Sequence, residues 1–358
     1  MEKFRSWRSS IDKPPLPVYL GRRTFGSLNR GEFLGGWLVS LDVARKKAQI
    51  PRVAALLGAL LLSLSPACSL KRVAVNQVGN ALAGSGAVFA GEEDPELARA
   101  AVPFGLKTIE GLLAESPEHK GLLLAACSGF TQYAYAFVQQ DADLIEAQDL
   151  ARATELRGRA KKLYLRARDY GLRGLEVESP GFRDQLQKDP EAALARIGKP
   201  QVPLLYYTAA AWAAAFALDV ADSQLSVDQT RIEKMMGRAL ALDEGWDEGA
   251  IPEFLGTWEA GHAAAGGSLP KAQQYFERAR QLAVAPRASI FVAMAEGLAV
   301  PAQNRKAFEA RLREALAVDV AKSPTRRLAN LIAQRRAQWL LGRAEDLFVD
   351  EPESKEKE

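Results

Sequence analysis

Small and aromatic residues recur along this chain at helical spacing. Within 269–282, Ala272, Phe276 and Ala279 stand four and then three residues apart, so they share one stripe of a helix. Ser268 precedes the segment as an N-cap, and Pro270 lies in its first turn. A ring between alanines lets neighbouring helices approach closely and fills the gap between them. This spacing is typical of the second helix of a tetratricopeptide repeat.

The same stripe recurs elsewhere in the chain. Its other copies are Ala160, Tyr164 and Ala167; Gly105, Ile109 and Leu112; and Phe308, Leu312 and Ala315. One such helix cannot bury its apolar face alone, so the repetition predicts a stacked array of helices.

Helix-start signals punctuate the chain from residue 94 onward. Each pairs a capping residue with proline: Asp94-Pro95, Ser116-Pro117, Asp189-Pro190 and Ser323-Pro324. No alternating β-branched run competes with them. We therefore expect an all-α fold, a tetratricopeptide-like helical-repeat array (α-solenoid) over 94–348. The expected helices are 95–115, 118–140, 143–172, 203–219, 227–242, 250–265, 269–283, 287–299, 303–317 and 324–346, with short helices within 181–197.

The first 67 residues have the pattern of an export signal. Arg45, Lys46, Lys47 and Arg52 precede an apolar run over 53–64, and small residues lead to Cys68. The run is shorter than the roughly 20 residues that span a bilayer. Because the cysteine resembles that of a bacterial lipobox, we expect lipidation at Cys68. The alternatives are a cleaved soluble form and an uncleaved anchor.

Several expectations about organisation and location follow from that segment. Residues 1–67 form a signal segment with an atypical N-terminal extension over 1–44, and 68–93 form a lipidated linker with a first helix. Residues 349–358 are highly charged and are expected to be a disordered tail. We expect a periplasmic protein that meets a membrane through its lipid alone. Ser69, in place of aspartate, favours the outer membrane.

The charge balance argues against nucleic acid as a partner. The formal net charge is +3, but residues 1–67 carry 11 basic and 4 acidic residues. The remainder has 36 basic and 40 acidic residues and lacks the basic patch that a nucleic-acid binder retains. Two cysteines, Cys68 and Cys127, are too few for a disulfide framework.

No catalytic or metal-binding pattern is evident. The two histidines, His119 and His262, lack metal-ligand spacing. The Gly84-Ser85-Gly86 run follows no buried strand and is not closed by Lys and Ser or Thr, so it is no phosphate loop. We expect no enzyme activity, no cofactor and no metal.

Aromatic residues are the more informative group. They either fill the core or line an apolar channel that takes a hydrophobic small ligand. The alanine-rich run 204–218 is about 15 residues long, which favours a buried helix over a membrane helix. The candidate channel residues are Tyr133, Phe137, Tyr206, Tyr207, Trp212, Trp246 and Trp258.

Several stretches together resemble the T component of TRAP transporters, the TatT family, between Cys68 and Phe348. They are Asp94-Pro95-Glu96-Leu97 with Pro103–Lys107, Gly129–Val138, Leu163–Leu175, Gly266-Gly267 and Leu328–Leu341. The resemblance implies a periplasmic lipoprotein of cryptic tetratricopeptide-like repeats, accessory to TRAP uptake. It further implies docking of the solute-binding protein, an apolar ligand channel, and a homo-oligomer, in particular a trimer. The alternative is a cell-envelope scaffold for another protein complex.

Overall fold

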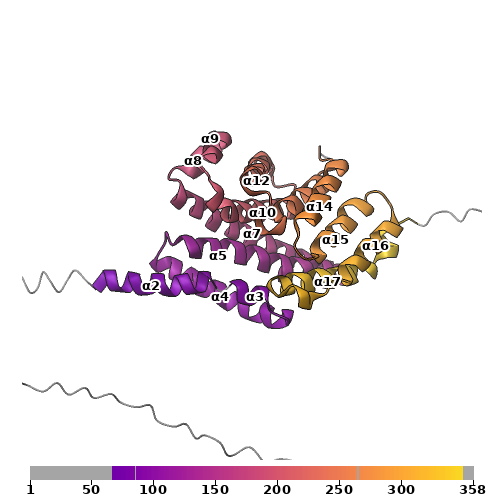
Figure 1. Cartoon of the computed structure of the whole chain (residues 1–358), viewed down its shortest axis with the longest axis horizontal. Coiled ribbons are helices and arrows are strands. Elements are labelled where there is room, and N and C mark those ends of the chain that lie inside the picture. The colour runs from indigo at the N-terminus through magenta and orange to yellow at the C-terminus, as the bar shows by residue number, and fades with distance from the viewer. Residues whose placement is uncertain (1–66, 85, 264–265, 350–358) are drawn as a thin grey trace, which may run out of the picture. The chain divides into compact units, whose positions relative to one another are not determined.

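The computed structural model describes residues 67–84, 86–263 and 266–349. All regular structure in these ranges is helical and none is strand, which confirms the all-α prediction (Figure 1). The predicted signal segment up to residue 66 and the tail from residue 350 lie outside the described residues. So does the side chain of Cys68, whose backbone belongs to the first described helix.

The helices follow one another with short connections. In order they are α2 (Ala67–Ala83), α3 (Gly86–Ala90), α4 (Pro95–Glu115), α5 (Lys120–Ala134), the π-helical turn η1 (Tyr135–Gln139), α6 (Gln140–Ile145), α7 (Leu150–Glu178), α8 (Phe182–Lys188), α9 (Pro190–Ala195), α10 (Val202–Leu218), α11 (Ser223–Val227), α12 (Gln229–Asp243), the short turn η3 (Trp246–Glu248), α13 (Ala250–Gly261), α14 (Leu269–Leu282), α15 (Ala288–Met294), the π-helical turn η5 (Ala295–Ala299), α16 (Arg305–Leu316), α17 (Arg327–Leu341) and α18 (Ala344–Leu347).

Side-chain caps set many of these helix starts. Asp94 accepts hydrogen bonds from the backbone N–H groups of Glu96 and Leu97 at 2.9 and 3.2 Å, so α4 has the predicted bounds. Ser268 caps α14 through the N–H of Lys271. These bonds satisfy donors that a helix N-terminus otherwise leaves without a partner.

Two predictions of helix bounds were wrong: the single helix expected over 324–346 is divided into α17 and α18, and the helices expected over 118–140 and 143–172 have other limits. The sequence suggested a break near 140–143, whereas α5, η1 and α6 form a continuous helix from Lys120 to Ile145. At η1 the N–H of Gln140 bonds to the carbonyl of Tyr135, five residues earlier, so the chain widens without stopping. The next helix, α7, begins after Asp149, whose carboxylate accepts from Arg152 N at 2.8 Å.

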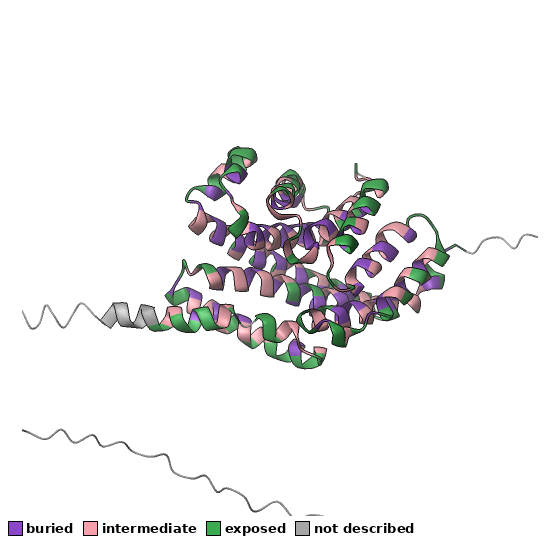
Figure 2. Ribbon diagram, in the orientation of Figure 1, coloured by how far each residue is buried: buried purple, intermediate pink, exposed green. Residues whose placement is uncertain are grey.

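Successive helices pack against one another to build the core. α7 lies between α5 and α10, and α10 also packs on α12; farther along, α13 packs on α14, and α16 packs on both α15 and α17. Figure 2 shows the buried residues on the helix faces that meet. Among the described residues, two stretches are apolar and long enough to cross a bilayer, Lys120–Ile145 and Lys199–Leu218, but 61% and 56% of their apolar windows are buried inside the fold.

Three of the four predicted stripes lie in this core; the copy on α4 lies there only in part, because Gly105 and Leu112 are partly exposed and only Ile109 is buried. Ala272, Phe276 and Ala279 have no exposed surface. Gly256 of α13 lies directly against the Phe276 ring, because a Cβ built there would come within 2.7 Å of the ring Cδ1. The stripes of α7 and α16 are buried as well: Ala160, Tyr164 and Ala167, and Phe308, Leu312 and Ala315.

Helix α17 contacts the start of the described fold as well as its own neighbours, packing on α3 and α4. Arg335 Nη2 donates to the carbonyl of Ala136 at 2.6 Å. Arg336 pairs with Asp143 at 3.0 Å and with Glu296 at 2.6 Å. In a linear repeat array each unit contacts only its neighbours, so these bonds add long-range ties to the stacking.

Candidate ligand site

Six rings form a continuous series between α10, η3 and α13, which we call the ring array. Tyr206 lies 5.2 Å from Tyr207, 4.7 Å from Trp246 and 6.3 Å from Phe254, measured between ring centroids. The members are Tyr206, Tyr207, Trp246, Phe254, Trp258 and His262. All six are partly exposed and pack against the main core, so the array borders the core and keeps part of its apolar surface accessible.

The α13 end of the array is a stack along one helix face. Phe254 stacks on Trp258 at 6.0 Å, and Trp258 meets His262 at 4.0 Å. Phe216 of α10 packs against both Trp258 and His262, at 6.2 and 5.7 Å. Because Phe216 is only 7% exposed, it backs the stack from the core side.

The tyrosine hydroxyls of the array are uncharged at neutral pH. Burial, with a smaller contribution from Asp247, raises the pKa of Tyr207 to about 12. Burial raises the pKa of Tyr206 as well, with Tyr207 as the next cause. Tyr207 Oη accepts a hydrogen bond from Gln132 Nε2 at 3.1 Å. The array therefore suits a ligand that is itself largely apolar.

A strained turn places Trp246 in the array. Asp247 and Glu248 adopt positive φ values of 46° and 54°, a region that costs residues other than glycine of order 1–3 kcal/mol. Arg287 Nη1 donates to the Asp247 carbonyl at 2.8 Å, and Arg326 Nη2 pairs with the Asp247 carboxylate at 2.8 Å. Two arginines from distant parts of the chain thus hold the turn in place.

Behind that turn lies a buried ion pair. Arg287 Nη2 lies 2.8 Å from Glu253 Oε2, and their side chains are only 11% and 15% exposed. Glu253 belongs to α13 one residue before Phe254, so the pair fixes α13 relative to the turn. Strain and buried charge together occur beside the accessible rings, as is common at functional sites.

The structure brings four of the seven predicted channel residues into the array: Tyr206, Tyr207, Trp246 and Trp258. Tyr133 and Phe137 form a separate buried pair 5.8 Å apart. Trp212 lies elsewhere on α10, with the Arg168 guanidinium 5.2 Å from its ring centroid.

Sequence reasoning missed Phe254 and treated His262 only as a metal candidate. Their positions four residues before and after Trp258 put all three on one helical stripe, and that spacing was the available signal.

Other reactive groups are engaged in the fold. Burial raises the pKa of the Cys127 thiol to about 12, so it stays protonated. His119 caps α5 by accepting from Leu122 N at 3.2 Å.

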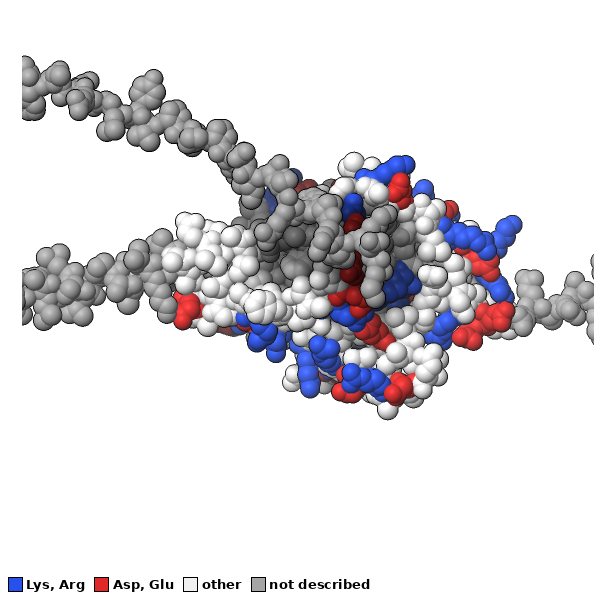
Figure 3. Space-filling view, turned by 90° about the horizontal axis from the view of Figure 1, so that it is seen from below, with Lys and Arg blue, Asp and Glu red and all other residues white. Residues whose placement is uncertain are grey.

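Within 67–84, 86–263 and 266–349, no group of three or more His, Cys, Asp or Glu side chains is placed to hold a metal ion. On the face that Figure 3 shows, acidic and basic side chains are interspersed.

Comparison with known proteins gives the chain its context. The sequence model of a family described as TRAP transporter T-component matches residues 91–348. The chain belongs to the TRAP transporter T-component family. The resemblance expected from the sequence motifs is thereby confirmed. Membership makes the protein an accessory component of a TRAP transporter system, and the matched span contains the whole ring array.

A relative of this T-component is found in Treponema pallidum (strain Nichols). It is an uncharacterized protein, 32% identical over 306 residues, in an alignment that covers 80% of this chain and 95% of the relative. The similarity therefore extends over nearly all of a second protein and supports the same family assignment.

Proposed function

We propose that this T-component is a periplasmic, lipid-anchored helical-repeat protein that docks the solute-binding protein of a TRAP system. In this proposal the ring array holds an apolar ligand or passes it through a channel. The helices form tetratricopeptide-like pairs, and the lipid is carried by Cys68. The observation that carries the proposal is the partly exposed ring array within the span that the family model matches.

Two features support the repeat interpretation. The buried stripes on α7, α14 and α16 supply the close packing that such pairs require. Consecutive helices also pack on one another, with α13 on α14 and α15 on α16. The array lies on α13 and α10, so a channel of this kind would run beside one of these pairs.

The exposed face of α4 supports a homo-oligomer, with a trimer expected. Leu97 and Phe104 are seven residues apart, on one helical stripe, and are 55% and 79% exposed. Two large apolar side chains exposed on one stripe suit a subunit contact, where aromatic residues are enriched. Phe104→Lys should shift the full-length protein to smaller species in analytical ultracentrifugation, whereas Lys107→Ala on the same helix should not.

Partner capture tests the docking proposal. The full-length protein is purified from membranes in non-ionic detergent, and the co-purifying proteins are identified. We expect a TRAP solute-binding protein or its permease, and Cys68→Ser should release the chain from the membrane fraction. Recovery of cell-wall or outer-membrane assembly proteins without TRAP components would contradict the transport role and favour a scaffold.

Ligand identification tests the role of the array separately. Small molecules extracted from the purified protein are identified by mass spectrometry. An apolar compound present at near-stoichiometric amount is the expected result. Protein that is free of any apolar compound, even when it is isolated together with its transporter partners, would argue against a ligand role for the rings.

A further inference from the structure

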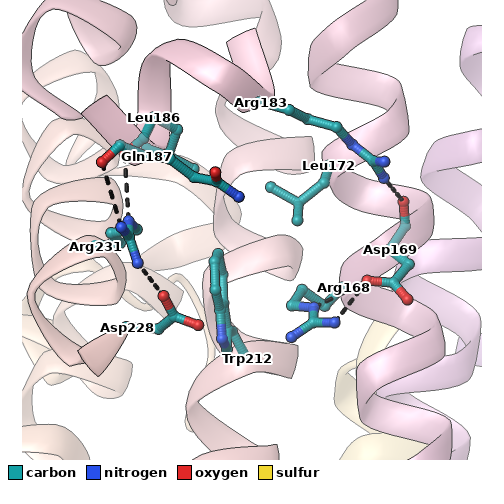
Figure 4. Close-up of a pocket in the computed structure, with 9 residues that line it drawn as sticks. All are labelled: Arg168, Asp169, Leu172, Arg183, Leu186, Gln187, Trp212, Asp228 and Arg231. Carbon is teal, nitrogen blue, oxygen red and sulfur yellow. Dashed lines mark hydrogen bonds and ion pairs between the residues drawn. The ribbon is translucent and has the colours of Figure 1, made fainter. Parts of the chain in front are cut away.

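A recess, which we call the Trp212 cleft, lies apart from the ring array. It has a volume of about 230 Å³ and opens between α7, α8, α10 and α12 (Figure 4). Trp212, Leu172 and Leu186 supply its apolar part. The polar lining consists of Arg168, Asp169, Arg183, Gln187, Asp228 and Arg231.

Arg231 serves as structural support for this cleft. Its Nε donates to the carbonyl of Leu186 and its Nη2 to that of Gln187, both at 3.3 Å, and its Nη1 pairs with Asp228. The carbonyls are at the C-terminal end of α8, where a positive charge is favourable. The charge of Arg231 is therefore already balanced within the fold.

Arg168 is only partly engaged. Its Nε and Nη2 both donate to Asp169 Oδ1, at 3.0 and 2.8 Å. Its guanidinium lies 5.2 Å from the centroid of the Trp212 ring, a cation–π arrangement that fixes the side chain over the indole. Among the described residues, its Nη1 has no acceptor, so this nitrogen is available to a ligand.

Arg183 is the most loosely paired cation of the lining: the hydrogen bond from its backbone N–H and, to a smaller extent, its electrostatic interaction with Glu176 lower the pKa of that carboxylate, but the two side chains form no direct ion pair. Nη2 donates to the Asp169 carbonyl at 3.0 Å, and this exposed side chain forms no ion pair within the described part of the chain. Its backbone is held in place, because Glu176 accepts hydrogen bonds from the backbone N–H groups of Gly181 and Arg183 at 2.6 and 2.9 Å. Figure 4 shows Arg168 and Arg183 approaching Asp169 from opposite sides, Arg183 at its backbone carbonyl and Arg168 at its carboxylate.

The composition of the cleft selects a class of ligand. Three guanidinium groups face two carboxylates, which leaves one net positive charge. A purely apolar ligand would remove the free donors of Arg183 from water without replacing their hydrogen bonds. An inorganic anion would make no use of the apolar lining, to which Leu172 contributes partly exposed surface and the largely buried Trp212, 6% exposed, contributes a smaller part. The volume is below the roughly 300 Å³ at which drug-sized sites begin, so the ligand is small.

We propose that the Trp212 cleft binds a small organic anion. Its carboxylate bonds to Arg168 and Arg183, and its apolar body lies against Trp212 and Leu172. This site is separate from the ring array, and the proposal does not depend on partner docking or on the apolar ligand.

A matched pair of probes tests the site. Phenylacetate and phenylacetamide have nearly the same shape, and only the acid carries a charge. Binding to the full-length protein in non-ionic detergent is followed by saturation-transfer NMR and calorimetry. We expect the amide to bind at least about tenfold more weakly, the effect of one lost charge-assisted hydrogen bond.

Variants locate the binding. Arg183→Gln should weaken phenylacetate binding about tenfold, because it removes the exposed charge without opening the core. Arg278→Gln, at an exposed arginine paired with Glu244 on another surface, should leave the affinity unchanged. Trp246→Ala, in the ring array, should also leave it unchanged and separates the two sites.

Three outcomes would overturn the proposal. They are equal binding of acid and amide, unchanged phenylacetate affinity in Arg183→Gln, and no saturation transfer from phenylacetate up to about 10 mM, a limit that excludes even weak sites. None of them bears on recovery of transporter partners, which is measured independently.

Discussion

The ring array and the buried stripe around Phe276 on α14 use aromatic residues in opposite ways. Phe276 has no exposed surface, with Ala272 and Ala279 on its own helix and Gly256 directly against the ring. The six rings of the array are all partly exposed, and their neighbours include a strained turn and a buried ion pair. Small neighbours therefore mark a ring that holds helices together. Rings, buried charge and backbone strain found together are the features on which the proposed ligand role of the array rests.

The largest expected effect on stability is at the buried Phe276. Phe276→Ala should lower the free energy of unfolding by about 4 kcal/mol, because it opens a cavity that glycine and alanine neighbours cannot fill. Thermal or urea unfolding monitored by circular dichroism measures the loss. Gln274→Ala, exposed on the same helix, should change stability by less than about 0.5 kcal/mol. A loss below about 1 kcal/mol for Phe276→Ala would refute the enclosure of this ring.

The support of the array comes next. Arg287→Met leaves Glu253 buried without its partner and removes a donor from the strained turn, so we expect a loss of about 3 kcal/mol. Arg278→Met breaks an exposed pair with Glu244 and should cost less than about 1 kcal/mol. Adding Glu253→Leu to Arg287→Met should recover part of the stability. If the double variant is no more stable than the single one, the buried charge is not the cause.

A ring of the array itself should matter more for binding than for folding. Trp246→Ala removes a partly exposed ring, so we expect a loss of about 1–2 kcal/mol, well below that of Phe276→Ala. The amount of co-purifying apolar compound should fall sharply when it is measured by mass spectrometry. Trp339→Ala, at another partly exposed indole outside the array, should retain the compound. Equal retention in both variants would remove Trp246 from the site.

The smallest effect is confined to alkaline pH. Burial raises the pKa of Tyr207 to about 12 in the folded protein, above the unfolded value of about 10. Its contribution to stability is then complete below about pH 10 and is lost as the pH rises through about 12. Tyr207→Phe should reduce the pH dependence of the melting temperature in that window. Identical pH profiles for the two proteins would contradict the burial of this hydroxyl.

Local sequence signals predicted much of the fold. Asp94-Pro95 marked the start of α4, and the Ala272–Phe276–Ala279 spacing marked a buried stripe. Both depend on residues within one or two turns of each other, which is the range that helical periodicity reports. The break expected near 140–143 was wrong because the helix continues through a π-helical turn. Such a turn has no capping residue or proline that would mark it in the sequence.

The candidate site was only partly predictable. The aromatic residues of the sequence correctly suggested Tyr206 and Trp246 as members of one group. They gave no sign that Trp212 lies apart from that group. The positive φ values of Asp247 and Glu248 depend on Arg287 and Arg326, which follow Asp247 by 40 and 79 residues. A single sequence gives no indication of such pairings, because neither composition nor periodicity links positions so far apart.

The bonds that α17 makes to the other end of the fold have a consequence for biosynthesis. Arg336 and Asp143 are 193 residues apart, so their contact can form only when nearly all of the chain has been made. A linear repeat protein can begin to fold at any point and extend from there. Here the bonds between α17 and the early helices are completed only late in synthesis. A chain truncated before α17 should therefore show weakened hydrogen-exchange protection in α4 and η1, far from the cut.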